Sequence, residues 1–325
     1  MSPPKKVVRW LLEEDQPAVR YLTLTRLLGR PEDDGEVAAA REQIPVRGWA
    51  AEILAGQNPT GVWVSGDSLY QPKYLSTNWM LLILADLGLT EEDSRIRAAC
   101  KAWIDRFARP DGGFGPEGSK TSHLCIAGNT ARALVAFGYA DDPRVRSAFE
   151  WLATHRDRNG GWSCFGSGRN LDSWEGLSAF ARYPRQKWTE EMRRAVDLGV
   201  EFYLQRELHK QGDHYEPWYR FHHPVHYYYD LLVGLELVTA LGRGADPRLE
   251  HALSVLKRKR RADGRWNLDA VHPDLEGKMA DWYAAHPKHR PTPFALEAPG
   301  EPSKIITLRA YLVLERLDET ASPSR

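Results

Sequence analysis

Two kinds of helical segment alternate along the chain. Residues 74–89 contain Asp86 as their only formal charge, and residues 121–139 contain only Arg132. The segments that follow are rich in charge, with eight charged residues each in 91–108 and 246–261. A helix that is apolar on nearly every side is buried, whereas an amphipathic helix has one face in water. The alternation therefore predicts an inner layer of buried helices and an outer layer of amphipathic helices.

The buried type of segment occurs six times. The six segments are residues 15–28, 74–89, 121–139, 170–183, 225–241 and 304–317. The first and the last of them are apolar on more than one face, whereas an open solenoid needs polar caps at its ends. We therefore expect an all-α fold in which about six helical hairpins close into a single α/α toroid, with an open solenoid as the alternative. Residues 1–325 would form one domain, with residues 1–56 as N-terminal hairpins that close the ring.

A glycine-containing turn that ends in an aromatic residue separates the hairpins. The closing aromatics are spaced 51, 48, 56 and 48 residues apart. They are Trp63, Phe114, Trp162, Trp218 and Trp266. A period of this length is typical of repeat architectures, in which each unit buries its apolar face against its neighbours.

Composition narrows the choice of partner and compartment. Lys+Arg and Asp+Glu are equal at 44 each, so no global field favours nucleic acid. Three scattered cysteines do not make a disulfide framework, and with an N-terminus unlike a signal peptide they favour a cytoplasmic protein. The apolar run 79–85 is too short for a transmembrane segment. Residues 270–302, rich in Pro and His, interrupt the repeat and are expected to form a loop or lid.

The turns resemble motifs of a known superfamily. Gln57 followed by Gly61-Val62-Trp63 is similar to the repeated motif of squalene–hopene cyclases, and the later turns keep its Gly-x-aromatic end. The chain thus resembles the α/α toroids of the terpenoid-cyclase and protein-prenyltransferase superfamily. That resemblance implies a central cavity for a small apolar or isoprenoid ligand. The superfamily includes cyclases, transferases and non-enzymatic domains, so the resemblance does not decide among these functions.

A candidate acid lies at the start of the fourth buried segment. The segment Asn170-Leu171-Asp172-Ser173 is similar to the Asp-x-Asp-Asp motif of protonating cyclases, and the resemblance implies that Asp172 is the proton donor. The flanking carboxylates of that motif are replaced here by Asn170 and Ser173. Glu175, three residues later, could supply the like charge that keeps Asp172 protonated. Alternatively, Asp172 is simply the N-cap of its helix.

A second constellation contains two cysteines and a histidine. Cys125, Cys164 and His123 carry thiol and imidazole groups, the ligands that zinc prefers, and a catalytic zinc site needs three of them. The segment from Trp162 to Gly166 is similar to a zinc-binding motif of lanthionine cyclases, which are also toroids. The resemblance thus implies a zinc cofactor. The alternative is that both cysteines are small core residues.

The fifth buried segment opens with a histidine-rich stretch. If the helix runs from Val225 onward, His226 and Asp230 lie on one face at i and i+4, so that the carboxylate would orient the imidazole. His226 could then return a proton to an acid, ligate a metal or bind an anion. The alternative is a polar, hydrogen-bonded rim around a cavity mouth.

Other residues near the starts of the buried segments could line a cavity. Aromatic faces stabilise a carbocation, and converging helix N-termini favour an anion. The candidates for substrate binding are Asn78, Trp79, Trp174, Tyr227, Tyr228 and Lys304. The alternative is that the aromatics belong to the core.

Three functions remain open from these observations. The first is acid-initiated cyclisation of an isoprenoid in a single-barrel toroid, with Asp172, Glu175, His226 and Asp230 as candidate catalytic residues. The second is a zinc-dependent enzyme of the prenyltransferase or lanthionine-cyclase type. The third is a non-catalytic ligand-binding or scaffold domain. The sequence does not predict the oligomeric state.

Overall fold

The computed structural model describes residues 2–64, 66–164, 171, 173–209, 215–272, 275, 280–287, 290, 292 and 294–321. Within these ranges the regular structure is helical, and extended pairing is limited to isolated bridges such as that between Gln57 and Trp63. The predicted all-α fold class is therefore confirmed. None of the helices in the described ranges is both long and apolar enough to cross a bilayer.

The chain divides into two compact units. The middle unit is Glu52–Tyr203, and the terminal unit combines Met1–Ala51 with Leu204–Arg325. Each unit is built from alternating buried and amphipathic helices. Closure of all hairpins into one toroid stays a prediction.

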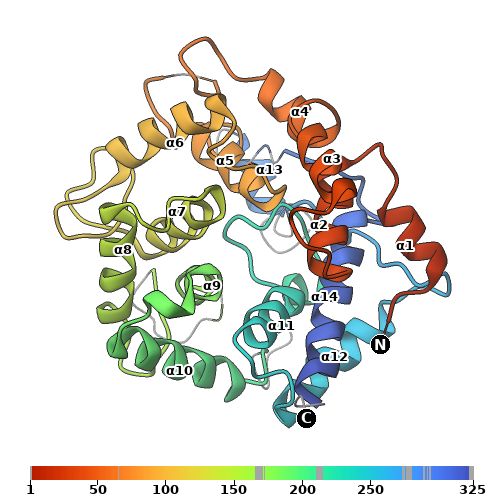
Figure 1. Ribbon diagram of the computed structural model, residues 1–325. Helices are drawn as coiled ribbons and strands as arrows, with labels where there is room; N and C mark the ends of the chain where they lie inside the picture. The colour runs from red at the N-terminus through yellow and green to blue at the C-terminus, as the bar shows by residue number, and fades with distance from the viewer. Residues whose placement is uncertain are drawn as a thin grey trace. The chain divides into compact units, whose positions relative to one another are not determined.

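The middle unit has the two predicted layers. Its inner helices are α5 (Thr77–Asp86), α7 (Leu124–Phe137) and α9 (Glu175–Arg182), and its outer helices are α6 (Ser94–Phe107), α8 (Pro143–Thr154) and α10 (Glu190–Leu204). The first nine residues of α5 are all buried, whereas α6 buries one face only. Helix α7 packs against α5, α8 and α9 (Figure 1). The buried and amphipathic segments predicted from the sequence therefore form the inner and outer layers of this unit.

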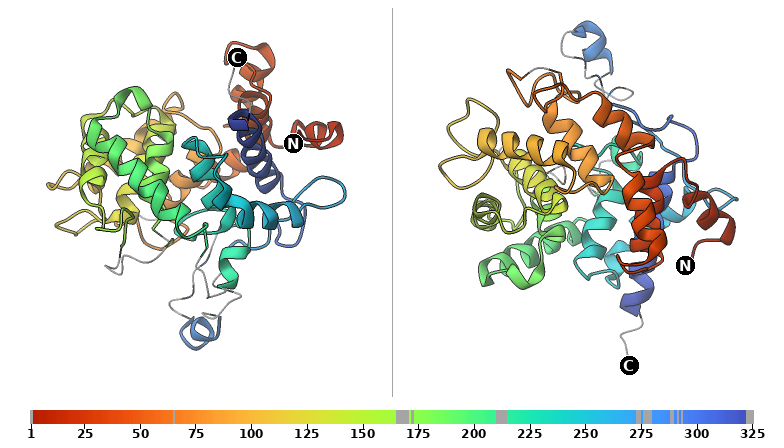
Figure 2. Two further views of the ribbon diagram at one scale, coloured as in Figure 1. Left: turned by 90° about the horizontal axis from the view of Figure 1, so that it is seen from below. Right: turned by 45° about the horizontal axis from the view of Figure 1, so that its top comes forward.

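The terminal unit joins the two ends of the chain. Its helices are α1 (Lys5–Leu11), α2 (Pro17–Leu22), the π-helix η1 (Thr23–Leu27), α3 (Gly35–Gln43), α11 (Leu231–Ala240), α12 (Glu250–Arg258), α13 (Ala280–Ala285) and α14 (Lys304–Ala321). The boundary between the units, after Ala51, falls within α4 (Gly48–Ala55). Helix α14 packs against α11 on one side and against α2 and η1 on the other (Figures 1 and 2). The ammonium of Lys304 lies 2.7 Å from Asp15 and 2.9 Å from Glu13. The first and last hairpins are therefore neighbours, as a closed ring requires.

The recurring turn has the same hydrogen bonds in each of four repeats. In the third repeat, Asp157 N–H donates to the Gly161 carbonyl at 2.8 Å, and Gly160 N–H donates to the Asp157 carbonyl at 3.0 Å. The turns that begin at Asn58, Arg109 and Arg261 repeat both bonds. Gly160 has a φ of 91°, a conformation that side chains with a Cβ rarely adopt. The predicted turn before Trp218 differs: Trp218 lies in the 3₁₀ helix η3 (Glu216–Tyr219), and Asp213 lies outside the described residues.

The tryptophan that closes the turn caps the preceding outer helix. Trp162 Nε1 donates to the Leu152 carbonyl at 3.0 Å, and Leu152 is in the last turn of α8. The last carbonyls of a helix have no partner within the helix, so the indole satisfies one of them. Trp63 and Trp266 make the equivalent bonds, each to a carbonyl ten residues earlier.

The same indole also explains two glycines in neighbouring helices. A Cβ on Gly176 of α9 would lie 3.0 Å from the Trp162 ring, and one on Gly199 of α10 would lie 2.6 Å from it. The ring is thus held between an inner and an outer helix at positions where a larger residue would collide with it.

The indole hydrogen bond can be tested by Trp162→Phe, which keeps an aromatic ring and removes the donor. Because the Leu152 carbonyl would stay buried without this partner, we expect the free energy of unfolding to fall by about 1–3 kcal/mol in a denaturant titration. Trp103→Phe is the matched control, since Trp103 is fully buried and its Nε1 has no hydrogen-bond partner in the described structure. Equal losses in the two variants would contradict a role for the hydrogen bond.

Candidate functional site

Single charges on the inner helices of the middle unit pair with one another. Arg132 Nη1 on α7 and Arg182 Nη2 on α9 both donate to Asp86 Oδ1 on α5, at 2.8 and 2.7 Å. The Arg132 guanidinium also lies over the Trp174 ring, 5.6 Å from its centroid. Asp86 and Arg132 are the lone formal charges of the second and third buried segments, and neither is among the predicted site residues. A buried charge needs a partner of opposite sign. Two lone charges of opposite sign on consecutive buried segments could therefore have predicted this ion pair.

The terminal unit has an equivalent pair. Arg309 on α14 donates through Nε to both carboxylate oxygens of Glu236 on α11, at 3.0 and 2.9 Å. Its Nη1 donates to the His222 carbonyl at 3.1 Å. In both units, therefore, a guanidinium fixes the register of two inner helices and also contacts a segment near a predicted site.

The histidine-rich segment folds differently from the prediction. Helix α11 begins at Leu231, and Asp230 is its N-cap, accepting a bond from Val233 N–H at 2.8 Å. The prediction that His226 and Asp230 share a helical face is therefore wrong. Asp230 pairs instead with His222, whose Nδ1 lies 2.7 Å from Asp230 Oδ2. Once the Asp230 side chain caps the helix, the residues before it are no longer helical, and the i, i+4 spacing has no meaning there.

The His222–Asp230 pair is removed from solvent. Both side chains have 0% exposure, and the backbone N–H of His222 also donates to Asp230 Oδ2 at 3.0 Å. Burial raises the pKa of Asp230, but the charge of His222, its hydrogen bond and the charge of Arg309 outweigh burial, so the net shift is downward. The carboxylate thus orients the imidazole through Nδ1, and His222 Nε2 is a buried atom with no hydrogen-bond partner in the described structure.

The candidate acid region lies at the start of α9. Asp172 lies outside the described residues. Glu175 is the first residue of α9 and is only 1% exposed, and Trp174 before it is also buried. A Cβ on Gly128 of α7 would lie 2.5 Å from the Glu175 backbone, so the two inner helices touch here. Among the described residues of this region, Glu175 thus places a buried carboxyl group at the contact between α7 and α9.

The candidate zinc ligands come together only in part. Cys125 N–H donates to Cys164 Sγ at 3.1 Å, which places the two cysteines side by side. The exposed His123 side chain lies elsewhere, with Nε2 3.1 Å from Ser119 Oγ. In the described ranges, no group of three or more His, Cys, Asp and Glu side chains has a geometry suited to a metal ion. That Cys125, Cys164 and His123 hold a zinc ion stays a prediction.

The residues predicted to bind substrate have packing or ion-pair contacts. Trp79 is fully buried, with Nε1 2.9 Å from the Tyr70 carbonyl. Tyr228 is half-buried, and its ring centroid lies 4.3 Å from that of His272 and 6.1 Å from that of His222.

The remaining candidates divide between the two units. Asn78 is buried in α5 and Trp174 faces Arg132, both in the middle unit. Half-buried Tyr227 precedes α11, and Lys304 is ion-paired, both in the terminal unit. That all of these candidates share one cavity stays a prediction.

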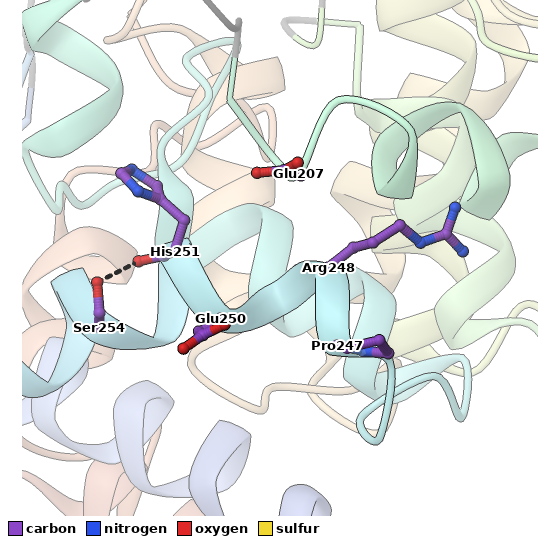
Figure 3. A pocket seen from close by; sticks show the side chains of 6 residues that line it. All are labelled: Glu207, Pro247, Arg248, Glu250, His251 and Ser254. Carbon is purple, nitrogen blue, oxygen red and sulfur yellow. Dashed lines mark hydrogen bonds between the residues drawn. The ribbon is translucent and has the colours of Figure 1, made fainter.

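A pocket in the terminal unit lies away from the residues that were predicted to bind a ligand. It has a volume of about 450 Å³ and is lined by six residues of the terminal unit (Figure 3). They are Glu207, Pro247, Arg248, Glu250, His251 and Ser254. The His251 ring stacks on His209 at 4.1 Å, and burial followed by the His209 charge lowers the pKa of His251.

The comparisons with known proteins concern the fold. No protein-family model matches the chain, and no curated protein matches it. It is similar to a variant of the type II terpene cyclase MstE from Scytonema, solved in complex with the substrate geranylgeranyl dihydroxybenzoate: 15% identity over 98% of this chain and 99% of that chain, with a TM-score of 0.46. A protein from Actinoplanes is similar at 16% identity, over 98% and 99% of the two chains, with a TM-score of 0.46. A likeness of this degree says nothing about the reaction or the substrate of the present chain.

The buried pair in the terminal unit predicts a pH dependence of stability. Asp230→Asn keeps an oxygen to cap α11 but leaves His222 without its carboxylate, so we expect a loss on the order of 3 kcal/mol in the free energy of unfolding at pH 7. Because the pKa of Asp230 is lowered in the folded chain, its contribution is present above the unfolded pKa of about 4 and is lost as the pH falls through the lower folded value. The difference between wild type and variant should therefore shrink below about pH 4 in denaturant titrations.

Asp142→Asn is the matched control for this measurement. Asp142 is also an N-cap, of α8, and its partner Arg144 is exposed, so the loss should stay below about 1 kcal/mol. A penalty for Asp230→Asn that is the same at every pH would contradict an ionic role for this carboxylate.

Proposed function

We propose that the chain acts on an apolar, isoprenoid-type substrate by acid-initiated cyclisation, with Asp172 as the acid and Glu175 as its supporting carboxyl group. The observation that carries the proposal is the burial of Glu175 at the first turn of α9, three residues after Asp172. Glu side chains are almost never fully buried unless they are paired, and the partner proposed here is the carboxyl group of Asp172.

The chemistry requires a carboxylic acid that stays neutral until it meets an alkene. Removal from water raises the free energy of the charged form of a carboxyl group and therefore raises its pKa. A second carboxyl group nearby makes ionisation of both groups less favourable still. Glu175 is shielded from water by α7, whose Gly128 allows the close approach. In this arrangement Glu175 would hold the proton on Asp172 until substrate binds, and Asp172 would transfer it to a terminal double bond.

The surroundings also limit which aromatic residue could stabilise the resulting carbocation. Trp174 already has the Arg132 guanidinium over its ring, so that face cannot also receive a carbocation. Arg132 Nε is buried and has no hydrogen-bond partner in the described structure, which would suit an anionic group on the substrate better than a cation. We therefore favour an isoprenoid that carries an acidic head group over an uncharged polyprene.

The proposal is tested by incubating the full chain with an isoprenoid diphosphate and, separately, with an uncharged polyprene, and by identifying cyclic products with mass spectrometry. Asp172→Asn should abolish turnover, and Glu175→Gln should lower it on the order of 10²-fold, since general-acid contributions have that size. Glu190→Gln is the control, because Glu190 begins α10 as Glu175 begins α9 but is exposed.

Two results would contradict the proposal. One is cyclisation that persists in a folded Asp172→Asn variant. The other is wild-type protein that binds either isoprenoid, as seen by calorimetry, and returns it unchanged, which would favour the non-catalytic ligand-binding function.

A further inference from the structure

Two thiols from neighbouring repeats meet at the N-terminus of α7. Cys125 is the second residue of α7, and Cys164 follows the Gly-Gly-Trp turn of the next repeat, 39 residues later. Cys164 Sγ accepts a bond from the Cys125 N–H at 3.1 Å. The N-cap residue His123 makes no side-chain bond to the helix, so the Cys164 sulfur satisfies one of the N–H groups that a helix leaves free.

The two thiols also interact with each other. A hydrogen bond with the Cys125 thiol, followed by burial and by the negative charge of Glu175, raises the pKa of Cys164. Both side chains are half-buried and therefore within reach of small solutes. Three bonds separate a cysteine sulfur from its own backbone nitrogen, so rotation about χ1 of Cys125 changes the sulfur–sulfur distance without moving the backbone.

We propose that Cys125 and Cys164 form a dithiol site that closes to an intramolecular disulfide when the chain meets a small disulfide oxidant. This proposal does not rest on the proposed cyclase function. The bond would tie the first turn of α7 to the segment that follows Trp162, which the fold already places against it.

The reaction is an ordinary thiol–disulfide exchange in two steps. The thiolate of one cysteine attacks a sulfur of the small disulfide, forming a mixed disulfide and expelling one small thiolate. The second cysteine, after losing its proton, attacks the sulfur of the first and expels the second small thiolate. Two protons leave the protein, the protein dithiol is oxidised by two electrons, and the small disulfide is reduced to two thiols.

The third cysteine provides an internal contrast. Cys100 lies in α6 with 0% exposure, whereas Cys125 and Cys164 are half-buried. A small disulfide cannot reach such a thiol in the folded chain, so Cys100 should stay reduced under conditions that oxidise the pair.

The proposal is tested by equilibrating the full chain with glutathione buffers of increasing oxidised fraction, quenching with acid, alkylating free thiols and mapping peptides by mass spectrometry. We expect a single linked peptide joining Cys125 to Cys164. Its equilibrium constant should be at least about tenfold larger in the native chain than in the chain held in denaturant, because the fold raises the effective concentration of one thiol at the other. The rate should rise with pH, since the thiolate is the attacking species.

Serine variants make the assignment specific. Cys164→Ser and Cys125→Ser should each give only a mixed disulfide with glutathione, and Cys100→Ser should leave the linked peptide unchanged; helical content by circular dichroism confirms that each variant is folded. The proposal is overturned by an equilibrium constant no larger in the native than in the denatured chain, or by a linked peptide that contains Cys100. It is also overturned if the purified chain carries about one equivalent of zinc that is released on alkylation of Cys125 and Cys164, because the thiols would then be metal ligands.

Discussion

The fold depends on an indole hydrogen bond that ends one helix and positions the next. In three repeats, the tryptophan that closes the turn donates to a carbonyl in the last turn of the outer helix, ten residues earlier. Two of these tryptophans, Trp63 and Trp266, also donate their backbone N–H to a threonine hydroxyl of an inner helix, Thr77 and Thr307. One residue therefore satisfies a free carbonyl and links the outer helix to the inner layer. Where Phe114 takes its place, Asp111 accepts bonds from Ser122 beyond the turn instead.

The charged side chains of the inner helices also need partners, because they are largely removed from water. Asp86, Arg132 and Arg182 belong to three inner helices and form one cluster, and Glu236 with Arg309 forms the counterpart in the terminal unit. In a low-dielectric interior an unpaired charge is costly, so each pair holds two inner helices in a single register. Hydrophobic contacts between α5, α7 and α9 would tolerate a shift of one turn more readily than these ion pairs would.

The sequence predicted the fold better than the site, for a physical reason. Periodicity and turn residues are local, so the helix layers and the glycine-containing turns between them could be predicted directly. The partner of Asp230 could not, because an N-cap changes the conformation of the residues before it, and His222 is eight residues away rather than four. Likewise, the adjacency of Cys125 and Cys164 was predictable from the repeat, but the outward position of His123 depends on Ser119 in its own loop.

A shared principle connects the N-termini of the inner helices. Each has free N–H groups that need an acceptor, and this chain uses a different atom each time: a carboxylate at Asp230 for α11, a thiol sulfur at Cys164 for α7, and Glu297 for Lys304 N–H of α14. Burial raises the pKa of Glu297, and its hydrogen bonds with Ser303 and with the backbone of α14 only partly offset this rise. This carboxyl group therefore becomes protonated at a higher pH than that of Asp230, whose pKa is lowered. Caps of such different chemistry respond to different conditions. The start of α7 is sensitive to oxidation of its capping sulfur, while α11 and α14 respond to pH through carboxyl groups whose pKa values move in opposite directions.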